Sequence, residues 1–456
     1  MKIIKYVTAA AVTLAVISVS GTVGLGLFLD AKSDALIRKL ESKIPGLEIR
    51  NVPADNGFIS KKGRLYINYK GMKGIASDQE GIFFAVDYEN YLGFLGVSGR
   101  FSYVPGFGNV SSIVQPYLKE LPQIKGNYSA SVFEGGASLT AATKETELPL
   151  DDGKCRISPL KLAVSANASL KADIRASLVS MNCEGDLLYA GRDAYSFSLQ
   201  DLNLRINPEI SGSAELAGAL IELGAKKISG EASTIYMIGF KPEDEVRDPS
   251  LRDAFIFKEP LLSLKIEATG KKRLYDIYSA AQGSYSLGMP YVRDNTEQRM
   301  QSIDDLSMQA SLKSADLYGL VKLISKGDLK ALKNADGIFS DPLRFDLKKL
   351  DFKKDGGAFS MRGKASAGVA FGKIVDPSAE FTGTAGKNMI DRFCENGYEN
   401  SLHSLLDKGY ITQSADQYSL DLKYSDNGLY LNNRPVQEDP SQEESADDPD
   451  FEQLQQ

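Results

Sequence analysis

Histidine is almost absent from this chain: the 456 residues include one histidine, three cysteines and no tryptophan. Sites that bind metal through several histidines are therefore excluded, and no paired-cysteine spacing of a zinc site is present. A Ser-His-Asp triad would have to use His403 itself. His403 lies in an apolar helical segment, and we expect it at a surface or partly buried position of that helix.

Sequence motifs of nucleotide and acyl chemistry are also missing. There is no G-x-S-x-G elbow, no phosphate loop and no dinucleotide fingerprint; Gly21, Gly24 and Gly26 resemble a glycine motif only in outline. The acidic pairs Asp151-Asp152 and Asp304-Asp305 lie in charged, turn-like stretches, where we expect solvated loop residues rather than an acid and base pair. We therefore predict no catalytic residue, no cofactor, no metal ligand and no enzymatic activity.

Positive charge is in short supply as well. The formal net charge is −7, and the isoelectric point near 5.2 argues against a nucleic-acid partner because phosphate binding needs a basic surface. The segment 437–456 holds eight acidic residues and no Lys or Arg. Such a composition buries too little apolar surface to offset the entropy of ordering. We predict a disordered acidic tail there.

One long run lacks charge altogether. Tyr6–Leu29 contains no charged residue and exceeds the roughly 20 apolar residues that cross a bilayer. We expect a single-pass transmembrane helix in the inner (plasma) membrane. Because Lys2 and Lys5 precede the run, the N-terminus is expected in the cytoplasm and the body in the periplasm. A signal peptide cleaved after Ser18–Ser20 is the alternative. Small residues four apart in the run would let two anchors pack, which makes the chain a candidate homodimer.

Beyond this run the dominant pattern has period two. From 160 to 178, apolar side chains occupy the even positions, and polar side chains such as Lys161, Asp173 and Arg175 occupy most odd positions. The alternation recurs at 65–69, 262–268, 359–371 and 418–424. Strands with one solvated face belong to antiparallel sheets, because parallel sheets are covered on both faces. The predicted fold class is mainly β: a large antiparallel sheet with one solvated face, covered by two or three helices.

The run 160–178 is either one strand of about 60 Å or two strands joined by a tight turn. If the turn is centred on Ser169, even positions face even positions and Cys155 faces Cys183. Directly opposed positions suit a disulfide bond, and exported compartments permit one. Against the turn, the loop lacks the glycine that a three-residue hairpin prefers, and Pro159 would interrupt the ladder. Cys155 and Cys183 are a candidate disulfide pair.

Helical spacing interrupts the β pattern towards the C-terminus. A helix is expected over 317–324 with Ser314 as its N-cap, and a further helical stretch over 389–406 carries one apolar stripe. Both are candidates for covering the apolar side of the sheet. The dipeptide Asn427-Gly428 predicts a hairpin that closes the chain.

The domain organisation expected from these features has five parts. They are a cytoplasmic stub at 1–5, the transmembrane anchor at 6–29, a stalk helix at 30–46, a β-rich periplasmic domain at 47–436 and the acidic tail at 437–456. The charged, proline-containing stretch 241–260 is the candidate break between two lobes of the β-rich domain.

Two segments carry a family resemblance. The first runs from Asn56 to Gly63 and leads into a strand at 64–70, and the second includes Gly409-Tyr410, 418–424 and 428–433. Together with the N-terminal run, they resemble the YdgA-like family of bacterial envelope proteins, whose domain has no assigned biochemical activity. The resemblance implies an inner-membrane anchor, a periplasmic body and self-association, and it transfers no catalytic residue.

These features favour a non-enzymatic envelope scaffold or protein-interaction module. The alternative is binding or transfer of an apolar ligand, a lipid, through a groove on the sheet, which requires that helices leave its apolar face open. The alanine-rich even positions of 160–178 favour close packing by a covering element. Expected partners are the membrane and a lipid or an envelope protein, with no nucleic acid.

Overall fold

Alternating apolar and polar residues form strands through most of the chain that the structure describes. The computed structural model describes residues 38, 41–42, 46–57, 60–69, 82–93, 96–108, 123–131, 136–150, 153–167, 171–187, 193–210, 216–233, 252–270, 274–289, 299–316, 342–370, 373–394 and 399–436. The chain divides into two units, and each is described by itself. Unit 1 comprises Met1–Ala268 and Ser279–Leu306, and unit 2 comprises Thr269–Tyr278 and Ser307–Gln456.

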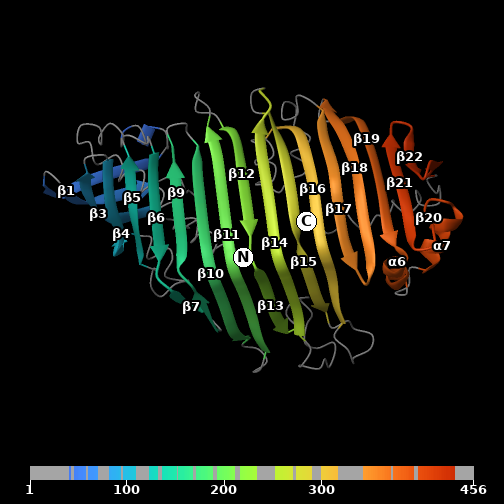
Figure 1. Cartoon of the computed structure of the whole chain (residues 1–456), viewed down its shortest axis with the longest axis horizontal. Coiled ribbons are helices and arrows are strands. Elements are labelled where there is room, and N and C mark those ends of the chain that lie inside the picture. Colours follow the sequence, from blue (N-terminus) through green and yellow to red (C-terminus); the bar gives the residue numbers. More distant parts are fainter. Residues whose placement is uncertain are drawn as a thin grey trace, which may run out of the picture. The chain divides into compact units, whose positions relative to one another are not determined.

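Unit 1 is built from antiparallel strands that pair with their neighbours (Figure 1). Their bounds are β1 Leu47–Asn56, β2 Ser60–Tyr69, β3 Ile82–Gly93, β4 Gly96–Gly108, β5 Ile124–Ser131, β6 Gly136–Thr143, β7 Thr146–Leu150, β8 Gly153–Ile157, β9 Leu160–Ala166, β10 Ala172–Leu187, β11 Asp193–Ile210, β12 Leu216–Gly224, β13 Lys227–Ser233 and β14 Arg252–Ala268. The strands β15 (Leu274–Met289) and β16 (Arg299–Asp316) contribute residues to both units. The prediction of a large antiparallel sheet is confirmed.

The long strands of unit 1 are irregular near their middles. β12 and β13 lie end to end between β11 and β14 (Figure 1). Where they meet, the Lys226 N–H donates to the carbonyl of Gln200 at 3.0 Å, and the Glu259 N–H donates to the carbonyl of Lys226 at 2.9 Å. Asp201 and Glu259 adopt positive φ angles of 50° and 48°. A residue outside the extended conformation shifts the side-chain alternation by one.

Unit 2 combines antiparallel strands with two short helices. The strands are β17 Leu343–Lys354, β18 Gly357–Ala370, β19 Lys373–Gly386, β20 Thr412–Gln413, β21 Gln417–Ser425, β22 Gly428–Leu431 and β23 Arg434–Pro435; the helices are α6 Lys387–Cys394 and α7 Glu399–Asp407. The hairpin predicted at Asn427-Gly428 is confirmed, because Ser425 pairs with Gly428. The φ of Gly428 is 108°, which glycine adopts without steric cost.

The prediction that two or three helices cover the sheet is wrong for the described part of the chain. The helical stretch predicted at 389–406 is present as α6 and α7, and α6 packs against β18, β19 and β21 of unit 2. These helices have 8 and 9 residues. At about 1.5 Å per helical residue, neither is long enough to cover strands that rise about 3.3 Å per residue over 14 or more residues.

Other helix predictions also need correction. Ser314, expected as an N-cap, lies in β16 with a φ of 58°, and residues 317–324 lie outside the described residues. Of the predicted stalk at 30–46, Arg38, Glu41 and Ser42 are described and helical, and Gly46 is described in a turn.

The predicted fold class included an N-terminal transmembrane helix. Among the described residues, no helix combines the length and the apolar character needed to cross a membrane. The run 6–29 and the acidic tail 437–456 lie outside the residues that the structure describes. The candidate lobe break at 241–260 does not coincide with the division into units, which falls at 268/269, 278/279 and 306/307, and residues 252–260 belong to β14.

Candidate functional site

The candidate site is an apolar face of unit 1 that begins in a closed core. The buried side chains of this closed core are Leu47, Ile49, Leu65, Ile67, Phe84, Val86, Tyr88, Phe101, Tyr103, Ile124, Tyr128, Leu139, Ala141 and Leu162. They come from β1–β6 and β9 and form one cluster. Large apolar side chains from seven strands are therefore shielded from water on this face of the sheet.

Glycines make this close packing possible. A Cβ atom on Gly99 would lie 2.3 Å from Cζ of Tyr128, and one on Gly63 would lie 2.4 Å from the hydroxyl oxygen of Tyr88. Both rings therefore occupy space that a side chain on the paired strand would fill. The tyrosines are 2% and 7% exposed, respectively.

A continuous row of paired apolar residues leads out of the closed core. We call this row the apolar ladder; in order from β6 through β9, β10, β11 and β12 to β14, it consists of Ala141, Leu162, Ala176, Leu204, Leu223 and Leu262. Leu162 is 3% exposed, whereas Leu223 is 41% and Leu262 is 47% exposed. The same face of the sheet is thus closed at one end and open at the other.

The neighbouring row repeats this arrangement. Val164 pairs with Ile174, Ile174 with Ile206, Ile206 with Ile221 and Ile221 with Leu264. All five side chains are half-buried. Two adjacent rows of leucine and isoleucine therefore form an aliphatic surface. The central strands that carry it, β10, β11 and β12, are each hydrogen-bonded to a strand on both sides.

Beyond the irregular region, aromatic side chains replace aliphatic ones. The ring centroids of Phe197 and Phe255 lie 6.5 Å apart, those of Phe255 and Phe257 lie 6.0 Å apart, and those of Phe257 and Tyr285 lie 4.7 Å apart. Phe257 is 37% exposed. In β11, apolar residues occupy even positions after Asp201, as at Leu204, and odd positions before it, as at Phe197, because the positive φ of Asp201 shifts the alternation by one.

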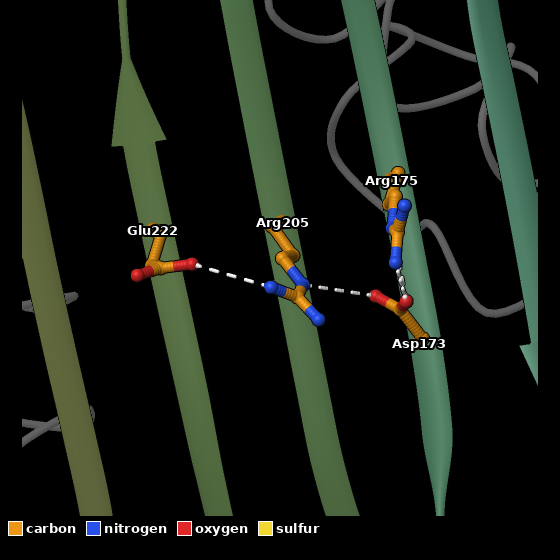
Figure 2. A network of polar contacts seen from close by, with 4 residues as sticks. All are labelled: Asp173, Arg175, Arg205 and Glu222. Carbon is orange, nitrogen blue, oxygen red and sulfur yellow. Dashed lines mark hydrogen bonds and ion pairs between the residues drawn. The ribbon is translucent and has the colours of Figure 1, made fainter.

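The opposite face of the long strands is charged. In Figure 2, Asp173 accepts hydrogen bonds from Arg175 on its own strand and from Arg205 on β11, with Nε distances of 2.9 and 3.2 Å. Arg205 also reaches Glu222 of β12 at 4.0 Å. The hydrogen bonds from Arg175 lower the pKa of Asp173. This side of the sheet is the solvated one, as the polar odd positions of 160–178 predict.

Asn90 is a polar exception within the closed core. It is 2% exposed, and neither its Nδ2 nor its Oδ1 atom has a hydrogen-bond partner among the described residues. Asn90 pairs with Gly99, and Gly99 with Tyr128, whose hydroxyl also lacks such a partner. Burial raises the pKa of Tyr128. Unsatisfied polar groups therefore lie in one cross-strand row of the closed core.

The structure joins Cys155 of β8 to Cys183 of β10 by a disulfide bond. The register predicted from parity is confirmed, because Leu160 pairs with Leu178 and Cys155 with Cys183. Local hydrogen bonds form at both places that counted against this turn, beside Pro159 and at the loop without glycine.

Side-chain acceptors replace the missing backbone contacts. Beside Pro159, the Ser158 Oγ accepts from the Ser180 N–H at 2.8 Å, and the Ser158 N–H donates to the Ser180 carbonyl at 2.9 Å. At the turn, Asn167 Oδ1 accepts from the Lys171 N–H at 3.2 Å. These hydrogen bonds between Asn167 and Lys171 close the turn without a glycine in the loop.

The other residues considered from the sequence do not assemble into a site. His403 is exposed on α7, as predicted. Asp304 and Asp305 are exposed but belong to β16 rather than to a loop, and Asp151-Asp152 lie outside the described residues. Within the described ranges, no group of three or more His, Cys, Asp or Glu residues is arranged to hold a metal ion.

No family model matches the sequence of this chain, and neither the curated proteins nor the solved structures contain a match.

Proposed function

We propose that this chain is a non-enzymatic protein of the cell envelope that binds the acyl chain of a lipid along the apolar ladder of unit 1. The observation that carries the proposal is the change in exposure along one paired row, from 3% at Leu162 to 47% at Leu262. Burying half-exposed leucine surface is favourable by about 25 cal/mol per Å². The open end of the ladder therefore gains free energy when an apolar ligand covers it.

The chemistry of the open end favours an acyl chain over a polypeptide. Protein interfaces need about one hydrogen bond per 100–200 Å². The open rows present leucine and isoleucine side chains, and the backbone of β12 is hydrogen-bonded to β11 and β14. The hydrocarbon part of an acyl chain has no polar group, so no hydrogen-bonding group of the ligand would lack a partner on this surface.

Location in the envelope is part of the proposal. The disulfide between Cys155 and Cys183 supports it, because disulfides persist in exported compartments and are rare in the cytosol. The family resemblance of the two terminal segments gives the same expectation.

Site-specific photocrosslinking tests the proposal. A photoreactive phenylalanine analogue is placed at Leu262, on the ladder, or at the adjacent Ser263, whose side chain projects to the opposite face of β14. After irradiation in intact cells, mass spectrometry of the purified protein identifies the adducts. We expect lipid adducts at Leu262 and none at Ser263, since alternate residues of a strand face opposite sides.

A second variant separates ligand loss from misfolding. Leu223→Asn combined with Leu262→Asn should reduce co-purifying lipid strongly while the circular dichroism spectrum stays unchanged. A scaffold role, the first expectation from the sequence, predicts adducts with one defined protein at Leu262 instead. Equal lipid labelling at Leu262 and Ser263 would refute binding along the ladder.

A further inference from the structure

A second concave surface lies on the charged side of the first strands of unit 1. It is a cavity of about 770 Å³, within the range of small-molecule sites. We call it the charged basin; its lining residues on this side are Lys62, Arg64, Tyr66, Asp87, Glu89, Arg100, Ser102, Lys125 and Asn127. It is distinct from the apolar ladder, which lies on β6, β9–β12 and β14.

One cross-strand row of the charged basin is centred on Glu89. Lys62, Glu89, Arg100 and Asn127 are paired in succession from β2 to β5. The Nζ atom of Lys62 lies 2.8 Å from Oε1 of Glu89, and Arg100 forms a second ion pair with the same carboxylate. Hydrogen bonds from Lys62 and its neighbours lower the pKa of Glu89 to about 2. The single carboxylate of Glu89 therefore forms ion pairs with two cationic side chains.

The second row ends in a lysine without an acidic neighbour. Arg64, Asp87, Ser102 and Lys125 are paired in succession across the same strands. Arg64 binds Asp87 through Nε at 2.6 Å and through Nη2 at 3.1 Å. Lys125 is exposed, and no ion pair involving it is found among the described residues.

The lining of the charged basin thus carries surplus positive charge. Among the described residues that line it, four cationic side chains, Lys62, Arg64, Arg100 and Lys125, stand against the carboxylates of Asp87 and Glu89, an excess of two positive charges. Asp55 lies opposite Lys62 in β1 but does not line the cavity. The net charge of the whole chain is −7, so the positive charge of the basin is opposite in sign to the charge of the protein.

From this charge and size we infer that the charged basin binds a phosphate monoester. A phosphate monoester carries about −1.5 to −2 charges at neutral pH, which complements the surplus of two. Its oxygens accept hydrogen bonds from Lys and Arg, and such charge-assisted bonds are stronger than neutral ones. The phosphate comes from a soluble ester or from the head group of a phosphatidic acid.

Two probes and two variants test the inference on the full chain. Titration calorimetry with glycerol 3-phosphate measures binding of the soluble ester, and flotation with vesicles of phosphatidic acid in phosphatidylcholine measures binding of the lipid. Lys125→Gln should weaken binding of at least one probe by about tenfold or more, the loss expected for a charge-assisted hydrogen bond. Lys154→Gln is the matched control, because Lys154 is an exposed lysine of β8 outside the basin.

The outcomes are distinct. Saturable binding that Lys125→Gln weakens and Lys154→Gln leaves unchanged supports the inference, and the probe that binds identifies the source of the phosphate. Arg100→Gln should give the same result and guards against a local effect of the first substitution. Absence of saturable binding to both probes, or equal binding by Lys125→Gln and the unmodified chain, overturns it. Lipid crosslinking at Leu262 is unaffected in either case, so the two proposals fail separately.

Discussion

The closed and open ends of the apolar ladder contain the same residue types in very different surroundings. Leu162 and Leu262 are both leucines in antiparallel strands and belong to one paired row, yet they are 3% and 47% exposed. At the closed end, β1–β6 and β9 bring large side chains such as Phe101 and Tyr128 into one buried cluster. Leu223 and Leu262 at the open end do not belong to that cluster, although Ile266, two rows further along the same face of β14, is 6% exposed. The position of a leucine along the row, and not its hydrophobicity, decides whether it is buried.

This contrast has a consequence for stability and function. Leucine at the closed end contributes to folding, because its surface leaves water in the folded state. Leucine at the open end contributes less, and in the proposed function its exposed apolar surface binds the ligand. Retention of half-exposed leucines in paired rows is difficult to explain by folding alone, since an isolated exposed apolar side chain is ordinary but contiguous ones mark binding surfaces.

The largest effect should come from truncating the same residue type at the two ends. Leu162→Ala removes buried methyl groups and should lower the free energy of unfolding by about 2–5 kcal/mol. Leu262→Ala should lower it by less than about 1 kcal/mol, because half of that side chain is already in water. Urea unfolding of the lipid-free protein, followed by circular dichroism, compares the two variants. Equal losses would show that the open end is covered in solution.

The disulfide should have the next largest effect. Replacing Cys155 and Cys183 by serine releases a cross-link between residues 28 positions apart, which should cost about 3–4 kcal/mol by the loop-entropy relation. Hydrogen exchange should increase first in β7 and β8, because β8 pairs with β10 beside the bond and β7 pairs with β8. Exchange in the closed core should change less. Uniform acceleration across unit 1 would instead indicate that the two regions unfold together.

Much of the local structure follows from the sequence. Parity within 160–178 predicted the register of β9 and β10 correctly, because side chains in a hairpin must keep alternate faces whatever lies around them. The Asn427-Gly428 turn was predictable for the same reason: its backbone conformation is set by the residues themselves. Features governed by neighbouring residues were thus accessible from the chain alone.

The difference between the closed and open ends was not accessible. A covered strand and an uncovered strand show the same period-two pattern at Leu162 and Leu262, because alternation records which side is apolar and not what lies against it. The shift of parity at Asp201 and Glu259 hid the relation between the aliphatic and aromatic rows. Ser314 was mistaken for a helix cap because serine is a common N-cap residue, and the strand in which it lies depends on long-range pairing that the local sequence does not show.

The charged basin escaped prediction for a related reason. Lys62, Glu89, Arg100 and Lys125 are separated by up to 63 positions in the sequence and are brought together by strand pairing. Period-two alternation placed none of them in a common site, since a charged residue on a solvated face is the ordinary case. Only the register shows that two cations share one carboxylate and that Lys125 faces none.

The smallest expected effect is a loss of stability at acidic pH, which tests whether the stability of the closed end depends on the ionisation of Glu89. The pKa of Glu89 is lowered from 4.5 to about 2 by its hydrogen bonds with Lys62, Tyr91 and Arg100. A carboxylate whose pKa is depressed in the folded state stabilises the fold above its unfolded-state value, and this stabilisation is lost as the pH falls through the folded-state value. Glu89→Gln should therefore lower the urea midpoint at pH 7, and the difference from the unmodified chain should shrink between about pH 4.5 and pH 2.

Glu184→Gln, at a glutamate side chain that is 70% exposed, is the control and should shift the midpoint little at any pH. If the Glu89→Gln difference persists unchanged at pH 2, the ion pairs of the charged basin do not stabilise β2–β5, and packing of the closed core alone accounts for the stability of these strands.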